Sequence, residues 1–304
     1  MDRQSFPRAV TLVEVGPRDG LQHEARPVDT ATKIAFIDRL SRTGLRRIES
    51  GSFVRPEAIL QLADADAVHA GIEHRPGVDY QALVPNRHGL QRAIEAGIRH
   101  ICIFTAATDG FCQHNIHCDI EASLARYAPL VELARARGMR VRGYLSCVLG
   151  CPYEGAVAPA RVASLAARLI DIGCDEVSLG DTIGAGTPLT AQTMLEAVAQ
   201  RIPIGRIAIH FHDTYGQALA NILACLETGV SMIDSAVAGL GGCPYAPGAS
   251  GNVATEDVVY MLEGMHIHTG IDLRQLIETG RFICARLGRT NLSRVATAMQ
   301  EASP

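Results

Sequence analysis

Short apolar runs rich in β-branched residues alternate with amphipathic stretches along nearly the whole chain. The runs are typical of strands, whereas stretches such as EASLARYAPLVELARARG and PARVASLAARLIDIG have helical spacing and end at glycine. Alternating strands and helices imply parallel pairing through right-handed crossovers, and eight units favour a closed (β/α)8 TIM barrel, an α/β fold. The predicted strands are Val10–Val15, Arg46–Ser50, Gln81–Val84, Ile101–Phe104, Val141–Ser146, Glu176–Leu179, Ile207–His212 and Met232–Ala236.

The C-terminal part of the chain has no strand-like runs. After Asn252, the segments TEDVVYMLEG and LRQLIETGRFICARLG predict helices, and no linker separates them from the barrel. We therefore predict one catalytic domain over residues 1–304, with additional C-terminal helices from about residue 253 to 304.

Composition and charge exclude several classes of protein. The 47% of hydrophobic residues suits a globular core, and 28 basic against 32 acidic residues give a net charge of −4, which argues against nucleic acid as a partner. No apolar run approaches the roughly 18 residues of a membrane span. The first residues lack the apolar core of a signal peptide, so we expect a cytoplasmic protein without a membrane partner.

Lysine and cysteine usage narrows the chemistry. Lys33 is the single lysine, and it lies beside a helical apolar stripe, so we expect it to face solvent. Without a lysine in a pocket there is no Schiff-base catalysis, and carbon–carbon chemistry would need a metal or another cofactor. The segment CQHNIHC matches neither paired CxxC spacing nor a zinc-finger pattern, so it predicts no zinc site.

Polar residues gather where predicted strands end, which is the end of a barrel that carries active sites. Examples are GPRDG after the first strand, Glu49 on the second and LGDT, with Asp181, after the sixth. On the seventh strand, IAIHFHDTYG, a period of two places His210 and His212 on one face, about 7 Å apart. Apolar neighbours must face the outer helices, so the histidines point inward. They are a candidate metal-binding pair, with a hydrogen-bonded core pair as the alternative.

Asp19 strengthens the metal interpretation. It follows the first strand in a turn rich in glycine and proline, and in a closed barrel only one strand separates strands one and seven. Two imidazoles and a carboxylate suit a divalent ion that also holds a substrate. The alternative for Asp19 is a turn-capping role. Arg18, beside it, is suited to a substrate carboxylate or a developing oxyanion.

A long loop rich in glycine follows the eighth strand, SAVAGLGGCPYAPGASGN, with Cys243 near its middle. Such loops often serve as active-site lids. A thiol with an ordinary pKa near 8.5 can donate a proton at neutral pH. A buried structural cysteine is the alternative.

Segments spread over nearly the whole chain together resemble 3-hydroxy-3-methylglutaryl-CoA lyase. In chain order these are VEVGPRDGLQ, SFV, VRGYLSC, GCPYEG, SLGDTIG, HFHDTYGQALAN and AGLGGCPYAPGASGNVATEDVVYMLEG. The resemblance implies a metal-dependent barrel lyase in which Asp19, His210, His212 and Asn252 bind Mg2+ or Mn2+. It further implies that Arg18 contacts substrate and Cys243 is catalytic, and that polar positions lining the site include Glu49 and Asp181.

The implied reaction is a retro-Claisen cleavage of 3-hydroxy-3-methylglutaryl-CoA to acetyl-CoA and acetoacetate. In this interpretation the metal holds the 3-hydroxyl and the distal carboxylate, and His210, with Asp181 nearby, moves the hydroxyl proton. Arg18 stabilises the thioester enolate, and Cys243 protonates it as the loop closes. An acyl-CoA is thus the expected partner, and a homodimer is the family expectation.

Three departures from the family pattern leave alternatives open. Ala25, Glu57 with Ala58, and His88 occupy positions where relatives commonly carry lysine or a Lys-Trp pair. If those residues contact CoA, a lyase for a larger 3-substituted 3-hydroxyglutaryl-CoA is one alternative. Another is a Claisen synthase that condenses acetyl-CoA with a 2-keto acid, although such enzymes usually carry a long C-terminal extension and lack the loop cysteine. A barrel that only binds a metabolite is the non-enzymatic alternative.

Overall fold

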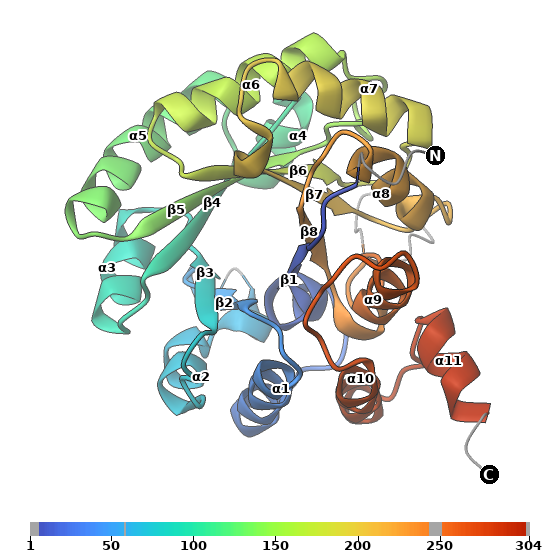
Figure 1. Cartoon of the computed structure of the whole chain (residues 1–304). Coiled ribbons are helices and arrows are strands. Elements are labelled where there is room, and N and C mark those ends of the chain that lie inside the picture. The colour runs from blue at the N-terminus through green and yellow to red at the C-terminus, as the bar shows by residue number, and fades with distance from the viewer. Residues whose placement is uncertain (1–5, 58, 243–250, 302–304) are drawn as a thin grey trace.

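The computed structural model describes residues 6–57, 59–242 and 251–301. Eight parallel strands form one closed barrel in which each strand pairs with the next along the chain, and β8 pairs with β1 (Figure 1). This confirms the predicted TIM barrel. The strands are β1 (Thr11–Glu14), β2 (Arg47–Ser52), β3 (Asp79–Leu83), β4 (His100–Ala106), β5 (Arg140–Ser146), β6 (Glu176–Asp181), β7 (Ile207–Phe211) and β8 (Met232–Ser235).

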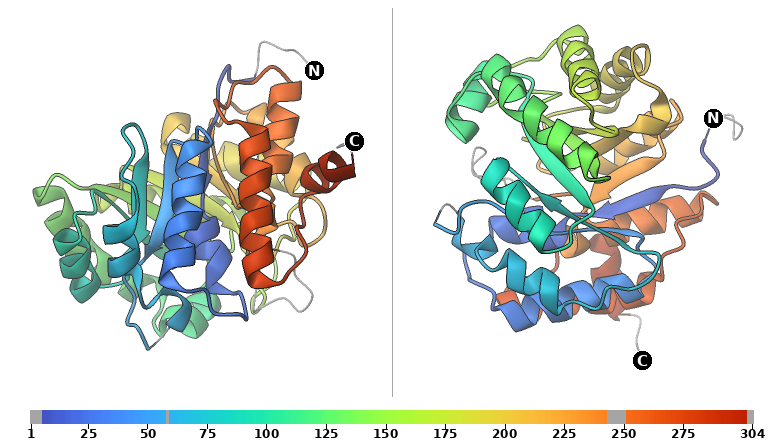
Figure 2. Two further views of the ribbon diagram at one scale, coloured as in Figure 1. Left: turned by 90° about the horizontal axis from the view of Figure 1, so that it is seen from below. Right: turned by 90° about the vertical axis from the view of Figure 1, so that its left-hand side faces the viewer.

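Helices surround the barrel, and the predicted C-terminal helices are present. After β8, α9 is followed by α10, which packs between α9 and α1, and by α11 against α9 (Figure 2). Among the described residues, no helix has both the length and the apolar character that a bilayer crossing requires. The helices are α1 (Thr30–Arg42), α2 (Ala65–Gly71), α3 (Arg87–Glu95), α4 (Asp109–Ile116), α5 (Ile120–Ala136), α6 (Pro159–Asp171), α7 (Pro188–Ala199), α8 (Ala218–Leu226), α9 (Thr255–Gly264), α10 (Leu273–Leu287) and α11 (Arg294–Glu301).

Strand β7 shows how the period of two sorts its side chains. Ile207, Ile209 and Phe211 are buried in the apolar core between barrel and helices, whereas His210 lines the cavity at the mouth. The parallel ladder ends at Phe211, one residue earlier than predicted. His212 instead forms an antiparallel bridge with Asn252, which brings the end of the glycine-rich loop beside β7.

Two short turns carry the first and last strands into the mouth of the barrel, and the buried carboxylate of Glu14 ties them together. Its Oε1 accepts hydrogen bonds from the backbone N–H of Gly16, in the π-helical turn η1 (Gly16–Gly20), and of Val237, in η4 (Val237–Gly239). Its Oε2 accepts from the Thr255 hydroxyl at the start of α9. A Cβ atom at Gly16 would lie 2.5 Å from Glu14 Oε1, which explains the glycine there.

Glu256 supports the second turn in a similar way. Both of its oxygens accept the backbone N–H of Ala238, at 3.0 and 2.8 Å, where Ala238 has the strained φ of +60°. Burial raises the pKa of Glu256 to about 8 and that of Glu14 to about 7, against the opposing effect of their hydrogen bonds. The folded protein therefore favours Glu256 in its neutral, protonated form.

The expectation that Lys33 faces solvent is wrong. Its side chain is 6% exposed and forms an ion pair with Asp64, 2.7 Å from Nζ to Oδ1. Nζ also donates to the carbonyl of Gln61 at 2.6 Å. The apolar stripe of α1 does face the barrel, but the segment before α2 folds over the flank of α1 and covers the lysine. Lys33 is therefore a structural residue that connects α1 to the segment before α2.

We expect Lys33→Ala to lower the free energy of unfolding by about 3 kcal/mol, because it leaves a largely buried carboxylate without its partner. Chemical denaturation measures the change. The control is Arg42→Ala on the same helix, whose pair with Glu73 is about half exposed on both sides, so we expect a much smaller effect there. Equal effects of the two substitutions would contradict the structural role of Lys33.

We expect the stability of the protein to fall as pH rises above about 5, and Glu256→Gln should remove the part of this fall that Glu256 contributes. The folded state binds the Glu256 proton up to about pH 8, whereas in the unfolded state the carboxyl has its ordinary pKa of about 4.5 and releases the proton there. Between these values the variant should gain up to about 1.4 kcal/mol per pH unit relative to wild type. Denaturation at pH 5, 6, 7 and 8 measures this, with the exposed Glu278→Gln as the control. Parallel curves for wild type and Glu256→Gln would refute the assignment.

Candidate active site and metal centre

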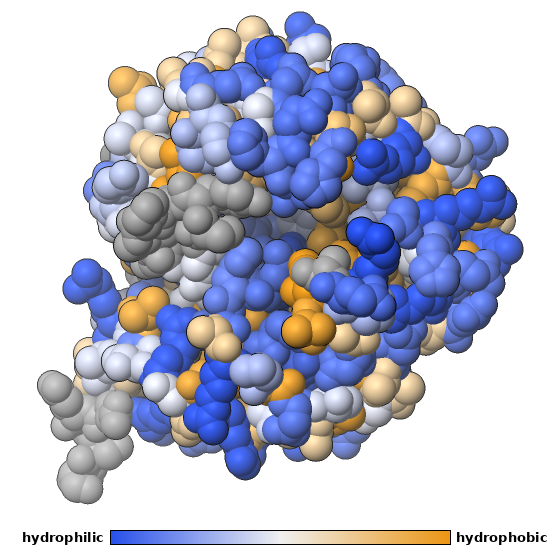
Figure 3. Space-filling model, turned by 180° about the vertical axis from the view of Figure 1, so that it is seen from behind, coloured by the Kyte–Doolittle hydropathy of each residue, from blue (hydrophilic) through white to orange (hydrophobic). Residues whose placement is uncertain are grey.

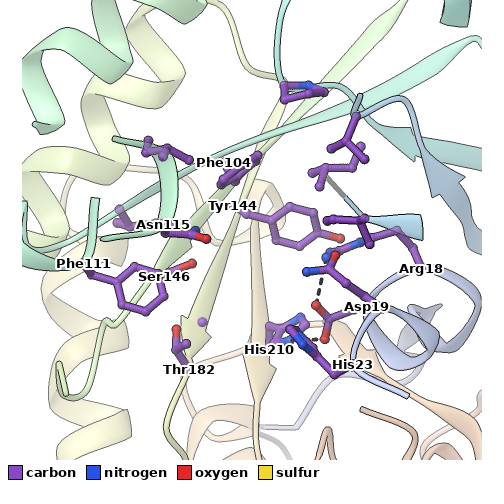
Figure 4. Close-up of a pocket in the computed structure, with 18 of the residues that line it drawn as sticks. Arg18, Asp19, His23, Phe104, Phe111, Asn115, Tyr144, Ser146, Thr182 and His210 are labelled. Atoms are coloured by element: carbon purple, nitrogen blue, oxygen red, sulfur yellow. Dashed lines mark hydrogen bonds and ion pairs between the residues drawn. The ribbon is translucent and has the colours of Figure 1, made fainter. Parts of the chain in front are cut away.

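A cavity of about 670 Å³ lies at the carboxyl ends of the strands. Figure 3 shows the molecule hollowed near the centre of this face, with mostly hydrophilic residues around the opening. Arg18 and Asp19 enter from the turn after β1, Tyr144 from β5, and His210 and His212 from the end of β7 (Figure 4). The cavity therefore gathers side chains from elements far apart in the sequence.

Asp19, His210 and His212 converge at one corner of this cavity. Asp19 Oδ2 lies 3.9 Å from Nε2 of His210 and 4.0 Å from Nε2 of His212. The candidate ligand atoms lie within 4.8 Å of one another, so small shifts of these side chains would let all of them contact one divalent ion. Within the described chain this is the one such group of three or more His, Cys, Asp or Glu residues. With both Nε2 atoms facing a carboxylate, the geometry favours metal ligation over a hydrogen-bonded core pair.

Asn252 completes this corner. Its Nδ2 donates to Asp19 Oδ2 at 2.8 Å and to the Leu240 carbonyl at 3.1 Å. Its Oδ1 is buried and, within the described chain, has no hydrogen-bond partner. An unpartnered amide oxygen beside a carboxylate is a ready ligand for a hard cation. The donor set of two imidazoles, one carboxylate and one amide oxygen thus fits a divalent ion.

The charges at this corner are strongly coupled. Although burial opposes ionisation, Arg18 and the two imidazoles hold the pKa of Asp19 well below its usual range. Burial and the neighbouring His210 lower the pKa of His212 to about 4, so His212 is neutral at physiological pH. An ionised carboxylate and a neutral imidazole are the forms that bind metal.

Arg18 is held in place by two carboxylates. Its guanidinium contacts Asp19 at 2.8 Å and Glu49 Oε2 at 2.9 Å. Glu49 is fully buried and also accepts the hydroxyl of Tyr144 at 3.2 Å. The Arg18 guanidinium carbon lies 5.5 Å from the centre of the Tyr144 ring. Arg18 therefore lines the cavity in a fixed orientation, and Glu49 acts on the site through it.

Asp181 lies close enough to His210 for the charges of the two groups to interact, and its carboxylate is bound by the loop that follows it. Its Oδ1 and Oδ2 accept the backbone N–H groups of Ala185 and Gly186, in the loop that follows β6. Burial raises the pKa of Asp181 to about 6, although these hydrogen bonds oppose the shift. The structure thus shows Asp181 supporting a loop, with the neighbouring Gly180 and Thr182 lining the cavity.

The side chain hydrogen-bonded to His210 is Asp234 on β8, 3.1 Å from Nδ1 to Oδ2. Sequence reasoning missed Asp234, and it missed the buried Glu14, Arg142 and Tyr144 as well. A signal was present for the two acids, since Glu14 ends the short strand TLVE and Asp234 lies within the short strand MIDS. An ionisable residue in such a segment must find a partner inside the barrel.

Cys243 lies in residues 243–250, outside the described part of the chain. The structure reaches Gly242, which lines the cavity, and resumes at Gly251, beside the corner formed by Asn252. The segment CQHNIHC does not converge on a metal: His114 stacks on Tyr153, and Cys112 contacts the Thr105 hydroxyl.

Comparisons with known proteins find relatives over nearly the whole chain. The HMGL-like family model matches residues 9–283. A 3-hydroxy-3-isohexenylglutaryl-CoA/hydroxy-methylglutaryl-CoA lyase of Pseudomonas aeruginosa is 55% identical over 295 residues, 97% of this chain and 98% of the relative. The mitochondrial hydroxymethylglutaryl-CoA lyase of Bos taurus is 55% identical over 294 residues, 97% and 90% of the two chains.

The fold comparison covers the same length. The crystal structure of hydroxymethylglutaryl-CoA lyase from Pseudomonas aeruginosa matches with a TM-score of 0.97 at 54% identity, covering 98% of this chain and 100% of that one. Identity above half over nearly the full length, on the same barrel, leaves no large insertion or missing element between them. We conclude that this chain belongs to the HMGL-like family.

Proposed function

We propose that the protein is a carbon–carbon lyase that cleaves 3-hydroxy-3-methylglutaryl-CoA to acetyl-CoA and acetoacetate by a retro-Claisen reaction. The observation that carries the proposal is the convergence of Asp19, His210, His212 and Asn252 beside Arg18 in one cavity. Relatives that are 55% identical over nearly the whole chain are named as lyases of this substrate.

A divalent cation, Mg2+ or Mn2+, is part of this proposal. Asp19, His210, His212 and the amide oxygen of Asn252 would hold it, because hard divalent ions favour oxygen ligands and accept imidazole. When bound, such an ion supplies Lewis acidity that makes a substrate hydroxyl easier to deprotonate and fixes a neighbouring carboxylate. The protein's part is to keep these donors in place before substrate arrives.

Arg18 would stabilise the negative charge that moves onto the thioester carbonyl oxygen as the carbon–carbon bond breaks. Glu49, Asp19 and the Tyr144 ring fix the guanidinium, so little reorganisation is needed during the reaction. The two carboxylates also balance the positive charge of the guanidinium. Glu49 and Asp181 are positioning residues in this scheme, Glu49 through Arg18 and Asp181 through the loop after β6.

Cys243 would deliver a proton to the enolate carbon of the departing acetyl-CoA. The resemblance of its surrounding sequence to the family is the support for this role. An acyl-CoA is the proposed partner, and the homodimer and the cytoplasmic location expected from the sequence remain predictions.

The direct test gives the purified protein Mg2+ and 3-hydroxy-3-methylglutaryl-CoA and follows acetoacetate release. The control reaction contains acetyl-CoA with pyruvate or 2-ketoisovalerate, and we expect cleavage without condensation. Cleavage of a substrate with a longer 3-substituent tests whether the cavity accepts a larger acyl group. Its apolar lining includes Phe104, Phe111 and Ile116. Condensation without cleavage would assign a synthase, and metal binding without either reaction would assign a binding protein.

We expect Arg18→Met to lower kcat by about 100- to 1000-fold, the usual loss when a fixed donor to a developing oxyanion is removed. Binding of Mn2+, followed by electron paramagnetic resonance of the free ion, should be retained. A variant with kcat within threefold of wild type would exclude the oxyanion role.

We expect Cys243→Ala to bind Mn2+ as wild type does and to lose most of its turnover, because the thiol is the proposed proton donor. Steady-state cleavage of 3-hydroxy-3-methylglutaryl-CoA measures the loss. The control is Cys225→Ala, a buried cysteine on α8 outside the cavity. Wild-type kcat in the Cys243 variant would remove this role.

A further inference from the structure

His210 and Asp234 are direct neighbours on adjacent strands. The register of the parallel strands β7 and β8 places these two residues side by side. Asp234 Oδ2 lies 3.1 Å from His210 Nδ1, and both side chains are buried. The other ring nitrogen, Nε2, faces Asp19 at 3.9 Å. The ring therefore has one nitrogen toward the barrel interior and one toward the proposed metal corner.

Asp234 is itself fixed from two further strands. Arg142 on β5 donates from Nη2 to Asp234 Oδ1 at 2.6 Å, and both side chains are fully buried. Ser178 on β6 donates its hydroxyl to Asp234 Oδ2 at 2.8 Å. A carboxylate buried with an arginine is held ionised, and an ionised carboxylate only accepts hydrogen bonds. His210 must then carry its proton on Nδ1.

His212 has no equivalent support. Its Nδ1 is buried and, within the described chain, has no hydrogen-bond partner. Its ring centroid lies 5.5 Å from that of His210, so the two imidazoles share the corner but not the carboxylate behind it. The fully buried ion pair of Arg142 with Asp234 thus supports the orientation of His210 and not that of His212.

We propose that Asp234 is the positioning carboxylate of His210: it fixes the tautomer with hydrogen on Nδ1 and presents the Nε2 lone pair to the cation. The inference rests on the proposed metal site and deepens it. Outer carboxylates of this kind orient metal-binding histidines and raise their basicity as ligands. With Nδ1–H donated to Asp234 and Nε2 on the cation, His210 has no nitrogen left to move the hydroxyl proton. His210 is then a ligand, and another group carries the proton.

The test is Mn2+ affinity of the full-length protein, measured by electron paramagnetic resonance of the free ion. Asp234→Asn puts an amide in place of the carboxylate, so an N–H can face His210 Nδ1 and favour the opposite tautomer. We expect affinity to fall about 10- to 100-fold. The matched control is Glu176→Gln, which alters the other carboxylate near Arg142, 3.4 Å from its Nε, and does not touch His210. We expect wild-type affinity there.

A second readout does not depend on metal. Although burial opposes the shift, Asp234 and Asp19 raise the pKa of His210, so the measurement is made at a pH high enough to leave its imidazole neutral. Under these conditions nitrogen-15 NMR of histidine-labelled, metal-free protein should show the single ring proton of His210 on Nδ1 in wild type and no longer uniquely there in Asp234→Asn. If Asp234→Asn fails to fold, Ser178→Ala removes one hydrogen bond to Asp234 and leaves the Arg142 pair. We then expect a several-fold loss of Mn2+ affinity.

The outcomes separate this inference from the proposed function. Wild-type protein that binds no Mn2+ would refute the metal site itself. The other case is that wild type binds Mn2+ while Asp234→Asn, or its substitute Ser178→Ala, has an Mn2+ affinity within twofold of wild type. That result would overturn the role of Asp234 and leave the metal site standing. A neutral wild-type His210 whose single ring proton is on Nε2 would do the same.

Discussion

The pairing of β8 with β1 is the constraint on which the site depends. Residues at the carboxyl ends of β1, β7 and β8 meet because β8 pairs with β1 on one side and β7 on the other. Closure places Asp19, from the turn after β1, about 4 Å from two imidazoles almost two hundred residues later in the chain. An open sheet would leave β1 and β8 at separate positions, and these donors could not share one ion.

Inside the barrel, charge is stabilised by pairing. Arg18 with Glu49, and Arg142 with Asp234, are ion pairs whose side chains are nearly or fully buried. Such pairs contribute little net stability, since desolvation offsets most of their attraction. Their value here is orientation: each pair fixes a side chain that reaches the metal corner or the substrate cavity. Inside this barrel, paired charged side chains occupy part of the space that apolar side chains fill in most barrels.

The turns after β1 and β8 are stabilised differently. Buried carboxylates accept hydrogen bonds from backbone N–H groups in these turns. Glu14 connects the turn after β1 to the turn after β8, and Glu256 holds Ala238 in a strained conformation. Both acids have raised pKa values because burial outweighs their hydrogen bonds. The turns that carry Arg18, Asp19 and the start of the glycine-rich loop are thereby linked to one another through the protein interior.

Local patterns in the sequence were enough to predict the barrel and the meeting of Asp19, His210 and His212 at its mouth. Alternating strand and helix signals determine a parallel closed sheet, and the strand period of two determines that His210 and His212 share one face. Partners across the barrel could not be predicted that way, because hydrogen bonds between strands depend on register. Asp234 rather than Asp181 therefore contacts His210, and a neighbouring segment buries Lys33. Local periodicity is encoded within one segment, whereas burial and pairing of charges are decided only when distant segments pack together.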